Sequence, residues 1–284
     1  MKVVLPTFFA LLAALSNAFA TVLQRRAALT VPQSRGFSMG LILALLRRPV
    51  WVAGVLTVVA AGVWQALALA TGPLSLVQPL FVLELPLALL IAALMQGRRP
   101  PAALLLKLLV VVVGLAVALL SAAPGGNRTH VSIDRWLPVL AACAGAVVVL
   151  TMTGLRRPAG RFRAACLGTA TAICFALTAG LMKTSVHILA EAGLAGFLTS
   201  WQTYAFGASG VCAMLLLEHA MQGGPLIASQ PALTLGDATV SFLLGILVYE
   251  EHMRAGWWLL PLALGIGLIT AGVLALARSE AEPL

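Results

Sequence analysis

Charged residues are scarce in this chain of 284 residues, making up 10% of it, while hydrophobic residues make up 61%. A soluble domain of this size does not need so much apolar surface, and the mean hydropathy of +1.03 agrees. Apolar runs of about 20 residues, the length that crosses a bilayer, recur along the whole chain. The composition therefore excludes an ordinary soluble protein and leaves no room for a second, soluble domain.

Acidic residues are also few: nine Asp and Glu stand against 18 Lys and Arg, which gives a net charge of +9. Most basic residues lie between apolar runs, as membrane topology requires, so we expect no nucleic-acid partner. The four cysteines lie inside apolar runs and form no C-x-x-C pair, which favours neither a metal site nor a disulfide. The chain has no Walker loop and no nucleophile paired with a base by spacing. We therefore expect neither an ATP-driven pump nor an enzyme, and no cofactor.

The apolar runs predict an all-α polytopic membrane protein with about nine transmembrane helices. Segment 37–46 is apolar but too short to cross the hydrocarbon region, so we expect it at the interface or re-entrant, with ten spans as the alternative. Residues 1–20 could be a cleaved signal peptide, but a retained first helix fits better because the apolar run continues to Leu23. The expected spans cover residues 5–24, 50–71, 74–96, 102–122, 136–155, 164–186, 197–217, 225–249 and 256–277.

Arginine clusters predict the orientation of these spans. They fall between the first and second spans, the third and fourth, and the fifth and sixth. With nine spans, all three loops share one side, which must be the cytoplasm. We therefore expect a multi-pass protein of the plasma membrane whose amino terminus lies outside and whose carboxyl terminus lies inside. Ten spans would move the amino terminus inside.

One motif occurs twice, about half a chain apart. Residues 68–80 read ALATGPLSLVQPL and residues 220–232 read AMQGGPLIASQPA, and the two align without a gap. Two four-span units, 1–123 and 161–284, separated by one linking span at 124–160, must have opposite orientations. The sequence thus predicts an inverted repeat within a single integral membrane domain, an arrangement typical of transporters.

Each copy of the motif also predicts local breaks in helix structure. Its glycine can adopt the conformations that end a helix, and the next proline suits the first turn of the following one. A second proline lies about two turns into that helix and removes one backbone hydrogen bond. The alternative is a pair of ordinary kinks that shape helix packing. The residues concerned are Gly72, Pro73, Pro79, Gly224, Pro225 and Pro231.

Two acidic residues, Glu84 and Asp237, follow these prolines near the middle of their spans. A charge at the bilayer centre costs roughly 3 kcal/mol, so such residues usually face a cavity or a partner. We predict that they bind solute or couple transport to protons or cations; a protonated structural acid is the alternative. Polar residues on the same or neighbouring spans join them as candidates. The candidate solute- or ion-binding residues are Asn17, Gln65, Gln78, Glu84, Gln230, Thr234, Asp237 and Ser241.

Other charged residues are expected to serve membrane placement. Lys107 and Lys183 lie near span ends, where long side chains extend to the interface. Glu250, Glu251 and His252 close a helix, which we expect near the surface, and we expect no metal site there.

Five short segments are similar to motifs of one transporter family. They are residues 51–54 (WVAG), 72–80 (GPLSLVQPL), 220–221 (AM), 229–231 (SQP) and 249–251 (YEE). They resemble the WWAG, APAxLVTPL, AL…VTP and FKE motifs of the NIPA-type magnesium transporter branch of the drug/metabolite transporter (EamA-like) superfamily. The likeness extends over most of the chain.

The resemblance implies a secondary transporter of a small solute, working by alternating access. The branch has an acid in its second span and another after its third, where this chain has Gly62 and Arg98, and Gln65 stands where Asn is usual. Divalent cations favour hard oxygen ligands, and this chain lacks acids that the branch has. The resemblance therefore supports the fold of the branch more strongly than its magnesium substrate. A divalent-cation transporter and a non-transporting scaffold are the alternatives. The expected partners are the lipid bilayer and a small solute or cation, with a homodimer left open.

Overall fold

The chain is all-α, and nine helical stretches among its described residues are long and apolar enough to cross a membrane. This confirms the predicted multi-span membrane protein. The described part contains no β-strand, only an isolated bridge between Gly125 and His252. Segment 37–46, on which the ten-span alternative depends, lies outside the described residues. The computed structural model describes residues 3–29, 49–97, 99–126, 128–129 and 131–281.

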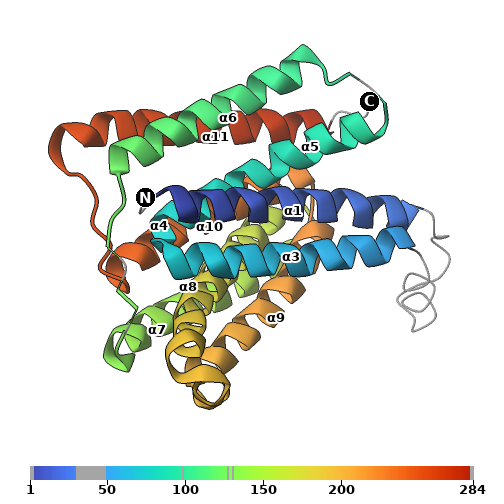
Figure 1. Cartoon of the computed structure of the whole chain (residues 1–284). Coiled ribbons are helices and arrows are strands. Elements are labelled where there is room, and N and C mark those ends of the chain that lie inside the picture. The colour runs from blue at the N-terminus through green and yellow to red at the C-terminus, as the bar shows by residue number, and fades with distance from the viewer. Residues whose placement is uncertain (1–2, 30–48, 98, 127, 130, 282–284) are drawn as a thin grey trace.

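The elements follow the predicted spans closely, and α4, η1 and α5 together make up the third span (Figure 1). One span is longer than predicted, because α8 continues past residue 186 to Thr199. The backbone at Gly193 is not helical, with φ of 65°, so this stretch consists of two helices joined at a kink that glycine permits. The elements are α1 (Val4–Leu29), α3 (Pro49–Thr71), α4 (Leu74–Leu80), the 3₁₀ helix η1 (Phe81–Leu83), α5 (Glu84–Met95), α6 (Ala102–Ala122), α7 (Ile133–Leu155), α8 (Arg161–Thr199), α9 (Trp201–Gln222), α10 (Leu226–Leu247), the 3₁₀ helix η2 (Gly256–Trp258) and α11 (Leu259–Ala281).

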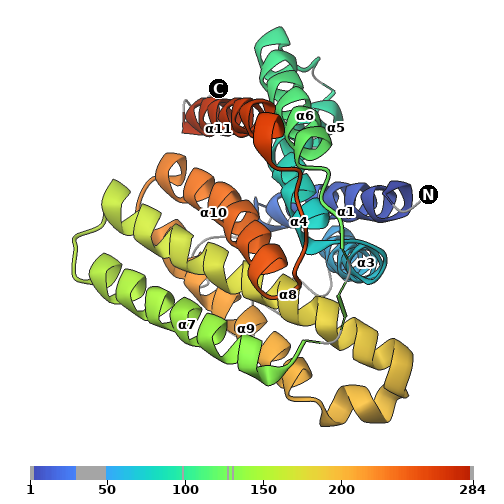
Figure 2. The same ribbon diagram turned by 90° about the vertical axis from the view of Figure 1, so that its left-hand side faces the viewer.

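The helices α7 to α10 form one group, and they cross the helices of the first unit, such as α3, at a steep angle near α4 (Figure 2). Figure 2 shows α7, α8, α9 and α10 with their axes roughly aligned, whereas α3 is viewed nearly along its axis. The pair α6 and α11 lies on the far side of α4 from α7 and α9 (Figure 2). The buried core contains residues from both groups, including Leu74 and Val77 of α4 and Trp136 of α7.

Large apolar side chains cover the outside of the helices. Leu56, Leu106 and Leu264 are among many that are more than half exposed, at 64%, 62% and 61%. In water such a surface would be unstable, whereas in a bilayer it faces hydrocarbon. The protein therefore contacts the lipid bilayer over much of its surface.

Both sequence-defined units pack their helices in the same order. The first helix contacts the second and the third in each unit: α1 contacts α3 and α5, and α8 contacts α9 and α10. Each hairpin glycine lies against the start of its unit's first helix. A Cβ at Gly72 would collide with Pro6, and one at Gly224 would collide with the carbonyl of Gly160. Neither glycine has a positive φ, so close approach, rather than the predicted turn conformation, requires glycine here.

Matching helices of the two units run in opposite directions where they meet. The segment after α10 lies at the start of α4, because Glu251 contacts the backbone of Leu74. Along α6 and α11 the contacts also run in opposite order: a Cβ at Gly265 would lie 2.6 Å from Ala118, and one at Gly272 would lie 3.4 Å from the amide of Val111. These antiparallel pairs bring the two units together.

The two internal prolines have different effects. Pro79 lies in α4, and the helix tightens into η1 directly after it. Helix α10, in contrast, continues through Pro231, where the sequence predicts a second break. A proline in the second turn of a helix removes only one backbone hydrogen bond, and α8 packs along α10 here and supports it.

Candidate functional site

Four of the predicted site residues meet halfway along the helices, and we call them the mid-helix cluster: Asn17, Glu84, Asp237 and Ser241. The Asn17 amide donates a hydrogen bond of 2.8 Å to the Glu84 carboxylate. The Ser241 hydroxyl donates one of 3.3 Å to Asp237. Glu84 lies close enough to Asp237 for the two carboxylates to interact electrostatically. One hydrogen bond thus joins α1 to α5, the other lies within α10, and the two carboxylates interact across the space between α5 and α10.

Cationic partners for the two acids are absent from the described part of the chain, where Glu84 and Asp237 form no ion pair. Both side chains are partly buried. A carboxylate inside a membrane normally pairs with a cation, binds a proton or faces a water-filled path. The described residues also contain no group of three or more His, Cys, Asp or Glu side chains that could hold a metal. The cluster can accept protons, a cation or hydrogen-bond donors of a solute.

The other four predicted site residues lie on α3, α4 and α10 outside this cluster. Gln78 is buried on α4. Gln65, on α3, and Gln230 and Thr234, on α10, are partly buried. They share helices or neighbours with the cluster but enter none of its hydrogen bonds.

A second polar group lies at the Gly72-Pro73 turn, and we call it the latch: Leu74, Ser75, Lys183, Tyr249 and Glu251. The Lys183 ammonium lies 2.8 Å from Glu251, and the two side chains are 0% and 1% exposed. The backbone amides of Leu74 and Ser75 donate hydrogen bonds of 2.6 and 2.8 Å to the same carboxylate. The Ser75 hydroxyl adds another of 2.5 Å. Four donors therefore satisfy one buried carboxylate.

The aromatic ring of Tyr249 packs against the Lys183 ammonium in the latch. The Lys183 ammonium lies 4.6 Å from the centre of its ring, within the range of a cation–π contact. The phenol donates a hydrogen bond of 2.5 Å to the Gly180 carbonyl, so the Thr184 hydroxyl, at 2.8 Å, donates to the phenol. Burial raises the pKa of Tyr249 above its ordinary value, which keeps the phenol a donor. Trp136 packs edge-on against the same ring at 6.1 Å.

The latch corrects two expectations about charged residues. Lys183 does not extend to the membrane interface, and Glu251 does not lie near the surface, because each neutralises the other inside the protein. Their neighbour Glu250 does behave as predicted: it is 38% exposed and pairs with Arg128, at 2.9 Å, and with Arg135. The one sequence signal for the latch was a lysine, Lys183, inside the predicted span 164–186.

Comparison with known proteins places the chain in a family. It is 31% identical over 284 residues to an uncharacterized protein of Corynebacterium glutamicum, covering 98% of this chain and 96% of the relative. The chain belongs to the family of that protein. No family model matches the chain, and no solved structure matches it.

The opposite ends of the third spans differ from the latch end. There, Arg26 donates a hydrogen bond of 2.6 Å to the carbonyl of Met95, which joins only α1 and α5. Helix α5 packs against α1 and α6, while α10 packs against α8. Figure 2 shows α10 turning away from α5. In the described residues, the contact between the two third spans is therefore made mainly by α4 and η1.

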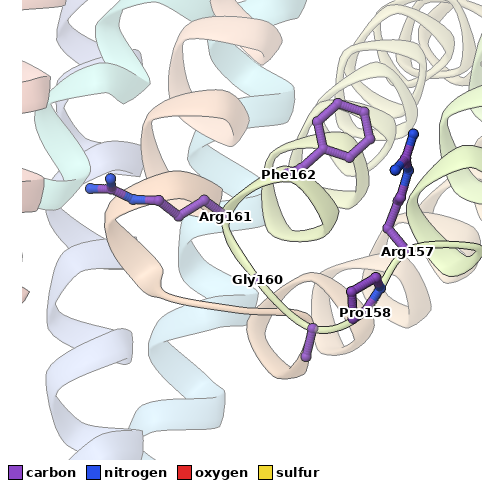
Figure 3. A pocket seen from close by; sticks show the side chains of 6 residues that line it. Arg157, Pro158, Gly160, Arg161 and Phe162 are labelled. Atoms are coloured by element: carbon purple, nitrogen blue, oxygen red, sulfur yellow. The ribbon is translucent and has the colours of Figure 1, made fainter.

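A surface hollow of about 440 Å³ lies elsewhere, at the connection between α7 and α8. Figure 3 shows Arg157 and Phe162 on one side of this loop and Arg161 pointing away from them. The Arg157 guanidinium lies 5.8 Å from the Phe162 ring centre, and the Gly160 amide donates to the Gly223 carbonyl at 2.9 Å. The hollow contains none of the predicted site residues.

Proposed function

We propose that this membrane protein is a secondary transporter that moves a small solute by alternating access, with its solute site at the mid-helix cluster. The observation that carries the proposal is the position of Glu84 and Asp237 halfway along the third spans of the two units, close enough to interact electrostatically. Acids halfway across a membrane without a cationic partner are expensive to bury. Binding a solute or a coupling ion offsets that cost.

The repeated architecture supports transport as well. The same packing order in both units, with antiparallel contacts between α4 and α10 and between α6 and α11, fits two units related by inversion. In such repeats the site lies near the bilayer midplane at the interface between units, and one unit rocks against the other. Glu84 and Asp237 occupy that position.

We further propose that the protein lies in the plasma membrane with its latch end outside. The arginine-rich loops would then face the cytoplasm. The latch, at the start of α4 and the end of α10, is at the opposite end of the spans from Arg26 and Arg161. The amino terminus would lie outside and the carboxyl terminus inside.

The solute class follows from the side chains of the cluster. Two carboxylates, an amide and a hydroxyl suit a solute with hydrogen-bond donors or positive charge, which accords with the drug/metabolite transporter resemblance. A non-transporting scaffold would be expected to neutralise both acids with buried cations, as the latch does for Glu251. We propose no catalytic step.

Reconstitution into liposomes tests this function. The purified protein is screened for flux of protons, magnesium and a panel of organic cations and neutral metabolites, with protein-free liposomes as the control. The proposal predicts flux of at least one organic solute above the control. Flux of magnesium alone would replace the solute with a divalent cation, and flux of nothing in the panel would contradict transport of these solutes.

A further inference from the structure

We infer that the latch is the outer gate of the transport path, and that Glu251 is the residue that holds the gate closed across the two units. The inference rests on the proposed function, since a gate has meaning only if a solute passes. It adds a residue that determines which end of the path is open. Glu251 belongs to the second unit, and its backbone partners Leu74 and Ser75 belong to the first.

The bonds of Glu251 divide into one that orients it and three that close the gate. The ion pair with Lys183 lies within the second unit and fixes the carboxylate in place. The amides of Leu74 and Ser75 and the Ser75 hydroxyl then bind that carboxylate from the first unit. Any movement that separates α4 from the end of α10 must break these three bonds.

The opposite end of the interface cannot be closed in the same way. In the repeat alignment that matches Gly72 with Gly224, Arg99 is the first unit's residue equivalent to Glu251. A guanidinium only donates hydrogen bonds, so it cannot bind helix amides as a carboxylate does. Arg99 is exposed, and α5 does not pack on α10 at this end. In this structure the latch end of the path is therefore closed, and the opposite end has no equivalent contact between the two units among the described residues.

Burial makes the latch an all-or-none contact. Opening the gate leaves the ion pair with Lys183 intact but removes three of the four hydrogen-bond donors from the Glu251 carboxylate, and a buried acceptor without its donors is costly. The latch carboxylate also has all of its hydrogen bonds made inside the protein. A small loss of contact at this point therefore favours complete separation rather than a loosened intermediate.

Cysteine accessibility tests the gate without any need for flux. The four native cysteines are replaced by alanine, and the protein is placed in nanodiscs with a water-soluble maleimide. Val248→Cys reports on the latch end, because Val248 is fully buried directly after α10. Ile91→Cys, buried between α5 and α1, reports on the general integrity of the fold.

We expect Glu251→Gln to raise the labelling rate of the Val248→Cys reporter by about tenfold or more and to leave that of the Ile91→Cys reporter unchanged. Glu250→Gln, the matched control at the exposed neighbour, should change either rate by less than about twofold. An equal rise at both reporters would make the latch a structural support only. No rise at the latch-end reporter in folded Glu251→Gln protein would also overturn the gate.

A reversible crosslink keeps the inference testable if Glu251→Gln does not fold. Gly125 follows the first unit's α6 and exchanges two backbone hydrogen bonds, of 3.0 and 2.8 Å, with His252. Such a pair has Cα atoms about 5.5 Å apart, which suits a disulfide. Gly125→Cys with His252→Cys should lower flux at least about tenfold when oxidised and restore it when reduced.

The two tests separate the gate from the function. Unchanged flux in the fully crosslinked protein would contradict the gate and leave transport intact. A latch-specific labelling response without flux of any solute would support the conformational switch and contradict the proposed transport of the panel solutes.

Discussion

The mid-helix cluster and the latch both connect the third spans of the two units, yet they handle charge in opposite ways. In the latch, Glu251 has a lysine, two amides and a hydroxyl as partners. In the cluster, Glu84 has one amide and Asp237 one hydroxyl, and neither has a cation among the described residues. This difference is what we expect if the latch holds the two units together and, as we propose, the cluster binds a ligand.

The largest effect should come from removing the cation of the latch. Lys183→Met should lower the free energy of unfolding by about 3–5 kcal/mol, because it leaves the Glu251 carboxylate buried without its cation. Denaturation in detergent measures the change. Lys107→Met, at a partly exposed lysine of α6, is the control and should cost less than about 1 kcal/mol. Equal effects of the two substitutions would show that the latch ion pair has no special structural role.

Substitutions in the mid-helix cluster should lower transport and leave stability nearly unchanged, unlike substitutions in the latch. Glu84→Gln should lower solute flux by at least about tenfold, equivalent to roughly 1.4 kcal/mol, while the free energy of unfolding stays within about 1 kcal/mol of the original. Flux in liposomes and denaturation of the same preparation give both values. A large loss of stability with normal residual flux would mean that Glu84 is a structural acid.

A smaller effect is expected for the residue that positions Glu84. Asn17→Ala removes the hydrogen bond to its carboxylate, which is worth about 0.5–1.5 kcal/mol, so flux should fall by about two- to tenfold. The concentration dependence of flux measures it. Thr57→Val, at a partly exposed threonine of α3, should have no effect. An identical response of the two variants would remove Asn17 from the site.

The smallest effect should come from Glu250, the exposed neighbour of the latch glutamate. Glu250→Gln removes the negative charge that pairs with Arg128 and Arg135. Exposed ion pairs contribute about 0–1 kcal/mol, so the change in the free energy of unfolding should lie within that range. If this variant were as unstable as Lys183→Met, burial would not explain why the latch ion pair contributes more to stability than the exposed ion pairs of Glu250.

Much of the fold follows from the sequence, because a membrane span has a simple requirement: about 20 apolar residues. The runs around residues 50–71 and 102–122 therefore predicted α3 and α6 almost to their ends. The sequence also placed Glu84 and Asp237 near the middle of their spans, five and six residues after the internal prolines, and in the structure the two acids are close enough to interact electrostatically. The sequence prediction ended this span at residue 186, whereas the helix runs on to the kink at Gly193 and a second, short helix reaches Thr199.

The latch could not be predicted, for a physical reason. Lys183 and Glu251 are separated by 68 positions, and the amides of Leu74 and Ser75 carry no side-chain signal at all. Rules for single residues assign a lysine to the interface and an acid after a helix to the surface. Only the packing of α4 between α8 and α10 makes burial of both charges favourable.

The central claim is that the mid-helix acids form the solute site of a transporter. Its most direct test is the flux of a transported solute in liposomes that contain either Asp237→Asn or, as the matched control, Asp134→Asn, which alters an exposed acid in the first turn of α7. The proposal predicts that Asp237→Asn lowers flux at least about tenfold and that Asp134→Asn leaves it unchanged. Equal flux through both folded variants would contradict it.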